Sequence, residues 1–302
     1  TAKSRSVILV LGAEGTPEYG RQFATWQGRW TEAAKRAGAK VRVIGRDDDE
    51  KTTDLERLRG LLDDEPKEGP EELWLVLIGH GTYDGRTARF NLRGPDVSDA
   101  GLATMLAPFR RPLVVINCSA SSGPVVNRLS GPDRVVLTAT RSGSEENFSR
   151  FGDFLSATIA DPAADYDKDG QTSLLEAYLA ASRRLAEFYR TESRLAPEHA
   201  LLDDNGDGLG TPADWFRGIR AVKKAKDGTT HDGHRAHQLV LVRSEQDRRI
   251  PPELLAERNR LELAVTQLRE QKAQLAEQAY YDQLEQLLLE LARLQEKIAP
   301  PH

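Results

Sequence analysis

The sequence is poor in sulfur, with one cysteine, Cys118, and one methionine among its 302 residues. A single cysteine excludes an internal disulfide and a zinc site built from cysteines. It leaves two readings of Cys118, an inert buried thiol or a reactive one. A reactive thiol would act as a nucleophile, because the thiolate is the form that attacks carbonyl carbons.

The chain also lacks long apolar runs and an excess of basic residues. No stretch approaches the ~20 apolar residues of a membrane-spanning helix, so no membrane span is expected. The 42 Lys and Arg residues are outnumbered by 47 Asp and Glu, and the net charge is −5. This balance argues against nucleic acid as a partner. The chain begins with Thr1 rather than Met, which is compatible with removal of a leader and export to the periplasm or the extracellular space.

The glycines near the N-terminus do not form a phosphate-binding motif. Gly12, Gly15 and Gly20 do not fit G-x-G-x-x-G, and no Gly-Lys-Ser/Thr follows them. A nucleotide-binding α/β domain is therefore disfavoured. A rise in melting temperature on addition of a nucleotide would support this alternative.

Short, continuous apolar runs separated by helical segments are the main structural signal. They predict strands at 7–11, 41–44, 73–78, 113–116, 134–140 and 238–242, and helices at 23–37, 54–62, 99–106, 149–160 and 173–189. Such runs are typical of strands buried on both faces, as in a mainly parallel sheet with helices on each side. A small hairpin outside this sheet is predicted around residues 87–92.

Two neighbouring strands are predicted to end in residues capable of nucleophilic or acid–base chemistry. The strand at 73–78 is followed by His80 and Gly81, and the strand at 113–116 is followed by Cys118. Because sites in parallel sheets form at the carboxyl ends of the strands, these residues are expected to lie close together. The histidine would favour the thiolate, and the amides of Gly81 and Cys118 would bind an oxyanion. The alternative is a buried cysteine beside a turn histidine.

These motifs resemble those of the caspase-fold cysteine peptidases, most closely the legumain family. The similar stretches are residues 12–22, 80–85, 118–123 and 138–154, and the resemblance covers roughly residues 5–160. It implies a caspase-like three-layer sandwich with a mainly parallel central sheet. It also implies a cysteine endopeptidase acting on protein or peptide substrates, in which Cys118 attacks the scissile carbonyl and His80 is the general acid.

The resemblance gives two opposite indications of specificity. Arg21 matches a position that lines the primary pocket of the family, which implies an acidic or Asn residue before the cut. Legumains carry Glu-Ala before the cysteine, whereas this chain has Ile116-Asn117, so an acidic pocket wall is missing. Glu145 and Glu146 would instead attract a basic residue.

Two acidic loops after the expected core predict Ca²⁺ as a cofactor. The first, residues 165–176, fills every ligand position of the EF-hand pattern and has glycine at the sixth. Its expected ligands are Asp165, Asp167, Asp169, Gln171 through its carbonyl, Ser173 and Glu176. The second, residues 203–214, would bind through Asp203, Asn205, Asp207, the Leu209 carbonyl and Asp214. Asp at its last position reaches less far than Glu, which makes this the weaker site.

The chain is expected to divide into a catalytic core at 1–160, a region with the calcium loops and final core elements at 161–245, and a Leu-rich helical appendage at 250–299. Leucines at 254, 261, 268 and 275 keep a seven-residue step, and a second register runs through 284, 287, 291, 294 and 298. The break between the registers predicts a helical hairpin or a kinked helix, which would bind the core, another copy or a partner.

The main alternative function is an inactive calcium-binding scaffold of the same fold.

Overall fold

The computed structural model describes residues 4–46, 51–225 and 230–298. Its chain separates into two compact units, one ending at Val242 and the other beginning at Arg243. The expected boundaries at residues 1 and 299 lie outside the described residues. Among the described helices, none has both the length and the apolar character needed to cross a membrane.

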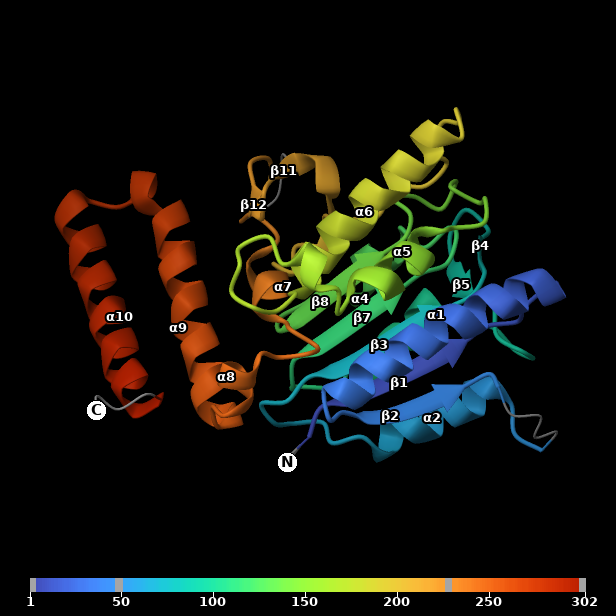
Figure 1. The fold of residues 1–302 in the computed structure, drawn as a ribbon, viewed down its shortest axis with the longest axis horizontal. Helices are drawn as coiled ribbons and strands as arrows, with labels where there is room; N and C mark the ends of the chain where they lie inside the picture. The colour runs from blue at the N-terminus through green and yellow to red at the C-terminus, as the bar shows by residue number, and fades with distance from the viewer. Residues whose placement is uncertain (1–3, 47–50, 226–229, 299–302) are drawn as a thin grey trace. The chain divides into compact units, whose positions relative to one another are not determined.

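The first unit is built on a seven-stranded sheet in the order β10-β9-β8-β7-β3-β1-β2 (Figure 1). Its strands are β1 (Ser6–Leu11), β2 (Lys40–Ile44), β3 (Leu73–Ile78), β7 (Leu113–Asn117), β8 (Arg134–Thr138), β9 (Leu201–Asp203) and β10 (Thr211–Pro212). Strands β2, β1, β3, β7 and β8 are neighbours in this order and pair in parallel. Strands β9 and β10 pair antiparallel at the edge next to β8. The predicted α/β fold with a mainly parallel sheet is therefore confirmed.

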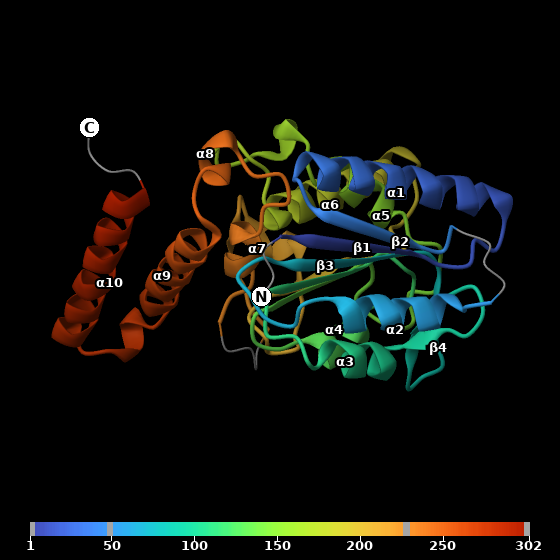
Figure 2. The ribbon, with the colours of Figure 1, turned by 90° about the horizontal axis from the view of Figure 1, so that it is seen from below.

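Helices cover both faces of the sheet, which gives three layers (Figures 1 and 2). The helices on one face are α1 (Pro17–Arg36), α5 (Phe151–Thr158), α6 (Leu174–Thr191) and the short α7 (His234–Gln238). Those on the other face are α2 (Asp54–Asp64), α3 (Asp99–Leu106) and α4 (Val125–Leu129). Each layer closes over its own apolar cluster, so strands β3 and β7 are buried on both sides.

Side chains alternate between the two clusters along the central strands. In β3, Trp74, Val76 and Ile78 belong to the cluster beneath α1 and α5. The intervening Leu73, Leu75 and Leu77 belong to the cluster above α2 and α3. This alternation follows from the two-residue period of a strand and fixes the direction of each residue at the strand ends.

Smaller elements surround the sheet. The predicted hairpin is part of a separate three-stranded sheet formed by β4 (Gly81–Tyr83), β5 (Ala88–Phe90) and β6 (Val97–Ser98). Short 3₁₀ turns and a two-stranded ribbon complete the unit: η1 (Pro162–Ala164), η2 (Ala213–Trp215), β11 (Phe216–Arg217) and β12 (Arg220–Ala221).

The predicted strand over residues 238–242 is wrong. Helix α7 ends at Gln238, and Val240 forms only an isolated bridge with Ser173. The Asp204 carboxylate accepts hydrogen bonds from the amides of Gly233 and Ala236, which satisfies donors of the first helical turn. The sheet edge is occupied instead by β9 and β10.

The second unit is a helical hairpin. It contains α8 (Glu245–Arg248), α9 (Pro252–Glu270), the 3₁₀ turn η3 (Lys272–Gln274) and α10 (Glu277–Ile298). Helices α9 and α10 lie side by side (Figure 1). The turn between them, at η3, comes before Leu275, the last leucine of the first register, so the gap between the two registers lies mostly within α10 and not at the turn. Leu261 and Leu268 of the first register and Leu294 of the second are buried. The two-helix prediction is confirmed.

Candidate functional site

The ends of β3 and β7 lie next to each other in register. Leu77 pairs with Asn117, and the Cys118 amide continues the ladder by donating to the Leu77 carbonyl oxygen at 2.9 Å. After β3 the chain passes through Gly79, which lies close to Gly12 at the end of β1. A Cβ added at Gly79 would lie only 3.0 Å from the Gly12 Cα. The residues following β1, β3 and β7 therefore meet at one carboxyl edge of the sheet, which we call the carboxyl edge.

The His80 imidazole is held at this edge by an aromatic cluster and one polar contact. Its ring centroid lies 4.9 Å from that of Tyr19, 5.2 Å from Phe23 and 5.8 Å from Phe148. Its Nε2 lies 3.2 Å from the backbone oxygen of Glu14. A carbonyl oxygen only accepts hydrogen bonds, so this contact places the proton of the neutral ring on Nε2. Nδ1 is left as the basic nitrogen.

Cys118 faces the apolar interior. It belongs to the cluster beneath α1 and α5, and it is 1% exposed. A Cβ added at Gly152 would lie 2.8 Å from both the Cys118 Cβ and the Trp26 ring. Burial, aided by the negative charge of Glu198, raises the pKa of the thiol to about 12. The Cys118 amide, expected to bind an oxyanion, is already engaged by Leu77.

The native thiol is expected to resist alkylation. With a pKa of about 12, the thiolate fraction of Cys118 at pH 8 is only about 10⁻⁴. Iodoacetamide should therefore leave the folded protein unmodified at this pH and label it in denaturant, as measured by intact mass. Rapid labelling of the native protein would contradict this burial and would favour a reactive thiol.

The next residue, Ser119, points to a different place. A Cβ added at Gly81 would come within 2.5 Å of the Ser119 Oγ and of the Ala120 carbonyl oxygen. The Ser119 hydroxyl donates to Asn117 Oδ1 at 2.7 Å, and its amide donates to the same oxygen at 3.0 Å. Ser119 thus borders the turn that carries His80, a position that the sequence patterns did not indicate.

A buried carboxylate anchors the layer beneath this edge. Glu198, which is 2% exposed, accepts hydrogen bonds from the Ser149 hydroxyl at 2.6 Å and the Tyr189 hydroxyl at 2.7 Å. It also accepts from the amides of Arg150 at 2.9 Å and Phe151 at 3.1 Å, where α5 begins. Sequence reasoning missed Glu198, because an isolated glutamate in a polar segment carries no pattern.

The three residues expected to line a substrate pocket, Arg21, Glu145 and Glu146, do not come together around His80 in the described contacts. Arg21 is exposed and lies two residues from both Tyr19 and Phe23 on α1, so it cannot share the face that contacts His80. Glu145 accepts from His199 Nδ1 at 2.7 Å and from the His199 amide at 3.1 Å. Glu145 also accepts from the Arg141 amide at 3.0 Å. Glu146 is exposed. The Glu145 carboxylate is thus engaged in holding its own loop and in joining it to His199.

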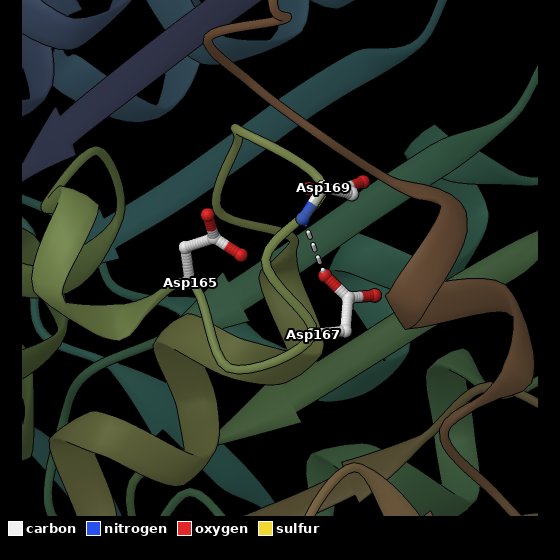
Figure 3. A group of neighbouring side chains, drawn as sticks. All are labelled: Asp165, Asp167 and Asp169. Atoms are coloured by element: carbon white, nitrogen blue, oxygen red, sulfur yellow. Dashed lines mark hydrogen bonds between the residues drawn. The ribbon is translucent and has the colours of Figure 1, made fainter.

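The first acidic loop brings three carboxylates together. Asp165, Asp167 and Asp169 each offer an oxygen within 4.8 Å of the others (Figure 3). Asp165 accepts from the Gly170 amide at 3.2 Å, and the Asp169 amide donates to Asp167 at 3.2 Å (Figure 3). Burial raises the pKa of Asp169, and the charges of Asp167 and Glu176 add to this effect. Bound cationic charge would relieve that repulsion.

The remaining expected ligands of this loop lie at the start of α6. Ser173 caps the helix, and the Glu176 carboxylate accepts from the Ser173 amide at 2.9 Å. The other Glu176 oxygen accepts from the amides of Tyr166 at 2.7 Å and Asp167 at 3.2 Å, so Glu176 folds back over the loop. Gln171 donates its amide to Asp169 at 3.0 Å.

The second loop repeats the same local geometry. Asp203 accepts from the Gly206 amide at 3.1 Å, Asn205 from the Asp207 amide at 2.8 Å, and Asp207 from the Leu209 amide at 2.8 Å. Asp203 is 1% exposed, and its Oδ2 is buried without a hydrogen-bond partner. Burial raises its pKa, with a contribution from the Asp207 charge. Asp214 is exposed on η2.

Helix α7 connects the two loops. His237 Nε2 lies 2.8 Å from Asp167 Oδ2 of the first loop. Asp204, next to the first ligand position of the second loop, accepts from the Ala236 amide at 2.7 Å. Asp232, whose pKa burial and the Asp204 charge raise to about 8, accepts from the Asp204 amide at 2.9 Å. The loops are therefore parts of one polar network.

Comparison with known proteins finds similarity in structure only. No protein-family model and no curated protein matches the sequence. The initiator caspase Dronc of Drosophila is 17% identical over 60% of this chain and 72% of its own, with a TM-score of 0.42. A protein of Geobacter sulfurreducens is 13% identical over 60% and 89%, with a TM-score of 0.40. Raptor of Chaetomium thermophilum is 9% identical over 52% and 18%, with a TM-score of 0.32.

Proposed function

We propose that the protein is a peptidase-type hydrolase that acts on peptide bonds at the carboxyl edge. The observation that carries this proposal is the anchored imidazole of His80, whose Nε2 faces the Glu14 carbonyl and leaves Nδ1 as the base. The next residue, Gly81, borders the turn that follows β7. A base that packing holds in one orientation is what general acid–base catalysis requires. The Gly81 amide remains the expected oxyanion donor.

His80 would move one proton in each half of the reaction. Its Nδ1 accepts the proton of the attacking group as that group adds to the carbonyl carbon, and then gives it to the departing amine. Water repeats the sequence and releases the acid product. The resemblance to the caspase-fold peptidases implies that Cys118 is the attacking group. The burial of Cys118 and the raised pKa of its thiol do not favour a thiolate.

The burial of Cys118 also supports a second candidate function, the calcium-binding scaffold without catalysis. On this alternative the hairpin of α9 and α10 would recruit another copy or a partner. Tyr281, Leu288 and Leu289 on α10 are about half exposed, at 48%, 46% and 50%, which supports such a role.

Peptide hydrolysis separates the two functions. The intact chain should be incubated with an unbiased peptide library, in calcium and in chelator, and the products read by mass spectrometry. The hydrolase predicts cleavage with a consistent residue before the cut. Absence of cleavage under both conditions would leave the scaffold as the better account.

We further propose that both acidic loops bind calcium and that the ions stabilise the region after β8. The ligands would be the oxygens named for each loop, and the buried Asp203 Oδ2 without a partner supports this assignment. Calcium would supply positive charge to carboxylates whose mutual repulsion opposes folding. The residues present fit such an ion, since hard oxygens are the ligands that calcium takes.

The second loop is also connected to the segment that joins β7 to β8. The Gly208 amide donates to the Ser130 hydroxyl at 2.9 Å, and Asn127 Nδ2 donates to the Gly208 carbonyl at 2.7 Å. Asn127 lies in α4 and Ser130 follows it, and α4 begins after the turn that contains Ser119. Calcium in this loop would thereby hold the end of α4 and the segment that leads into β8, which supports calcium stabilisation of this part of the chain.

Calcium is expected to raise the melting temperature of the intact chain. At a hundredfold excess over Kd, one site contributes about 2.7 kcal/mol to the free energy of unfolding. Asp165→Ala and Asp203→Asn should each reduce the shift, whereas the exposed Asp64→Ala should retain it. Scanning calorimetry in calcium and in chelator measures the effect. Identical melting curves for the wild type in both buffers would rule out the calcium proposal.

A further inference from the structure

We propose that Ser119, rather than Cys118, is the catalytic nucleophile. This inference rests on the proposed hydrolase function and names the group that attacks the substrate. Both side chains are 1% exposed, so accessibility alone does not distinguish them. Their directions and hydrogen bonds do.

The direction of Cys118 follows from the strand that precedes it. Val114, Ile116 and Cys118 lie two residues apart and belong to the same apolar cluster beneath α1 and α5. A Cβ added at Gly152 would meet both the Cys118 Cβ and the Trp26 ring, which places the Cys118 Cβ within this packed layer. No polar group in the described hydrogen bonds stabilises a thiolate there, and burial raises its pKa.

Ser119 takes the other direction and meets the turn of the histidine. Its Oγ lies so close to Gly81 that any larger residue at that position would collide with it. Gly81 carries the proposed oxyanion amide and follows His80 directly, so the hydroxyl borders the backbone of the turn that carries the proposed base. A hydroxyl remains neutral until a base accepts its proton, so burial costs it less than it costs a thiolate.

Asn117 holds the hydroxyl in its resting position. Its Oδ1 accepts from both the Ser119 hydroxyl and the Ser119 amide, which fixes the turn after β7. Attack requires the hydroxyl to leave this oxygen by rotation about a single side-chain bond, which exchanges staggered rotamers. Asn117 is thus a positioning residue of the nucleophile.

The reaction balances with water as the only co-reactant. The Ser119 Oγ forms a bond to the carbonyl carbon as its proton passes to His80 Nδ1. The carbon–nitrogen bond breaks, and the proton leaves with the amine. Water then adds to the acyl-serine ester and gives a proton to His80. Release of the carboxylic acid returns that proton to the Ser119 oxygen.

The test compares two adjacent residues in the full chain. Ser119→Ala and Cys118→Ala are assayed on the peptide that the wild type cleaves best, with melting temperatures as a check on folding. In parallel, the wild type is treated with a fluorophosphonate, and the modified residue is located by peptide mass spectrometry. We expect Ser119→Ala to lower kcat/KM on the order of 10³-fold or more, and Cys118→Ala to change it less than about fivefold. The adduct should lie on Ser119.

The outcomes separate this inference from the hydrolase proposal. Cleavage that survives Ser119→Ala but is lost in Cys118→Ala overturns the serine nucleophile and leaves the hydrolase intact. A Ser119 adduct without peptide cleavage supports the nucleophile and overturns peptide bonds as the substrate. A wild type that neither cleaves peptides nor forms the adduct overturns both.

Discussion

Replacing His80 with alanine is expected to lower kcat/KM for peptide cleavage by about 10²–10⁴-fold. The variant loses the imidazole that the proposal assigns as the base, which packing and the Glu14 carbonyl hold at the carboxyl edge. The fold should survive, because His80 is only partly buried and its one described hydrogen bond is to Glu14. Initial rates on a single cleaved peptide measure the change.

A second histidine provides the matched control for this variant. His234 lies on α7, away from the turn after β3, and His234→Ala should keep the wild-type rate within about twofold. Equal activity of the wild type and His80→Ala would refute the role of this imidazole. The pH dependence of kcat/KM for the wild type and His80→Ala adds a second readout. Loss of a general base removes the fall in rate at low pH that its protonation causes, whereas a purely structural role would leave the shape of the profile unchanged.

Replacing Glu198 with alanine is expected to lower the free energy of unfolding by about 3–5 kcal/mol. The carboxylate accepts from two hydroxyls and two amides, and each buried donor left without an acceptor costs about 1–3 kcal/mol. Water entering the space would recover part of the loss. Urea denaturation followed by circular dichroism measures the difference.

Two controls make the Glu198 prediction specific. Glu198→Gln keeps the shape and one accepting oxygen, so it should fall between the wild type and alanine. Glu192→Ala, at the exposed end of α6, should stay within about 0.5 kcal/mol of the wild type. If Glu198→Ala is as stable as Glu192→Ala, the carboxylate does not anchor α5 in solution.

The sequence predicted the core of the fold well because its strands are buried on both faces. The run from Leu73 to Ile78 is apolar at every position, and the structure has β3 at the same residues. The helix predicted at residues 99–106 is α3 with the same bounds, and the Ser98 side chain caps it by accepting from the Gly101 amide. Strong local signals of this kind need no tertiary context.

The edge strands were not predictable in the same way. β9 and β10 contain three and two residues, and they run into the second acidic loop. Their placement depends on pairing with β8 and on the network around Asp204 and Asp232, which joins distant parts of the chain. Pattern reasoning put the last strand near Val240 instead.

Complete burial of the central strands also explains why the direction of Cys118 was not apparent. An alternating strand would have shown which residues face the core, but Leu113 to Ile116 are apolar throughout. Only the two clusters reveal that Cys118 follows Val114 and Ile116 into the interior. The carboxyl edge was therefore predicted from sequence, whereas the choice between Cys118 and Ser119 needed the structure.

The most direct test of the central claim, peptide hydrolysis at the carboxyl edge, is cleavage-site profiling in H₂¹⁸O. The wild type and His80→Ala are incubated with the same peptide library, and the new carboxyl termini are sequenced by mass spectrometry. The account predicts termini that carry ¹⁸O from the wild type and almost none from His80→Ala. Labelled termini of equal abundance from both proteins, or none from the wild type, would contradict it.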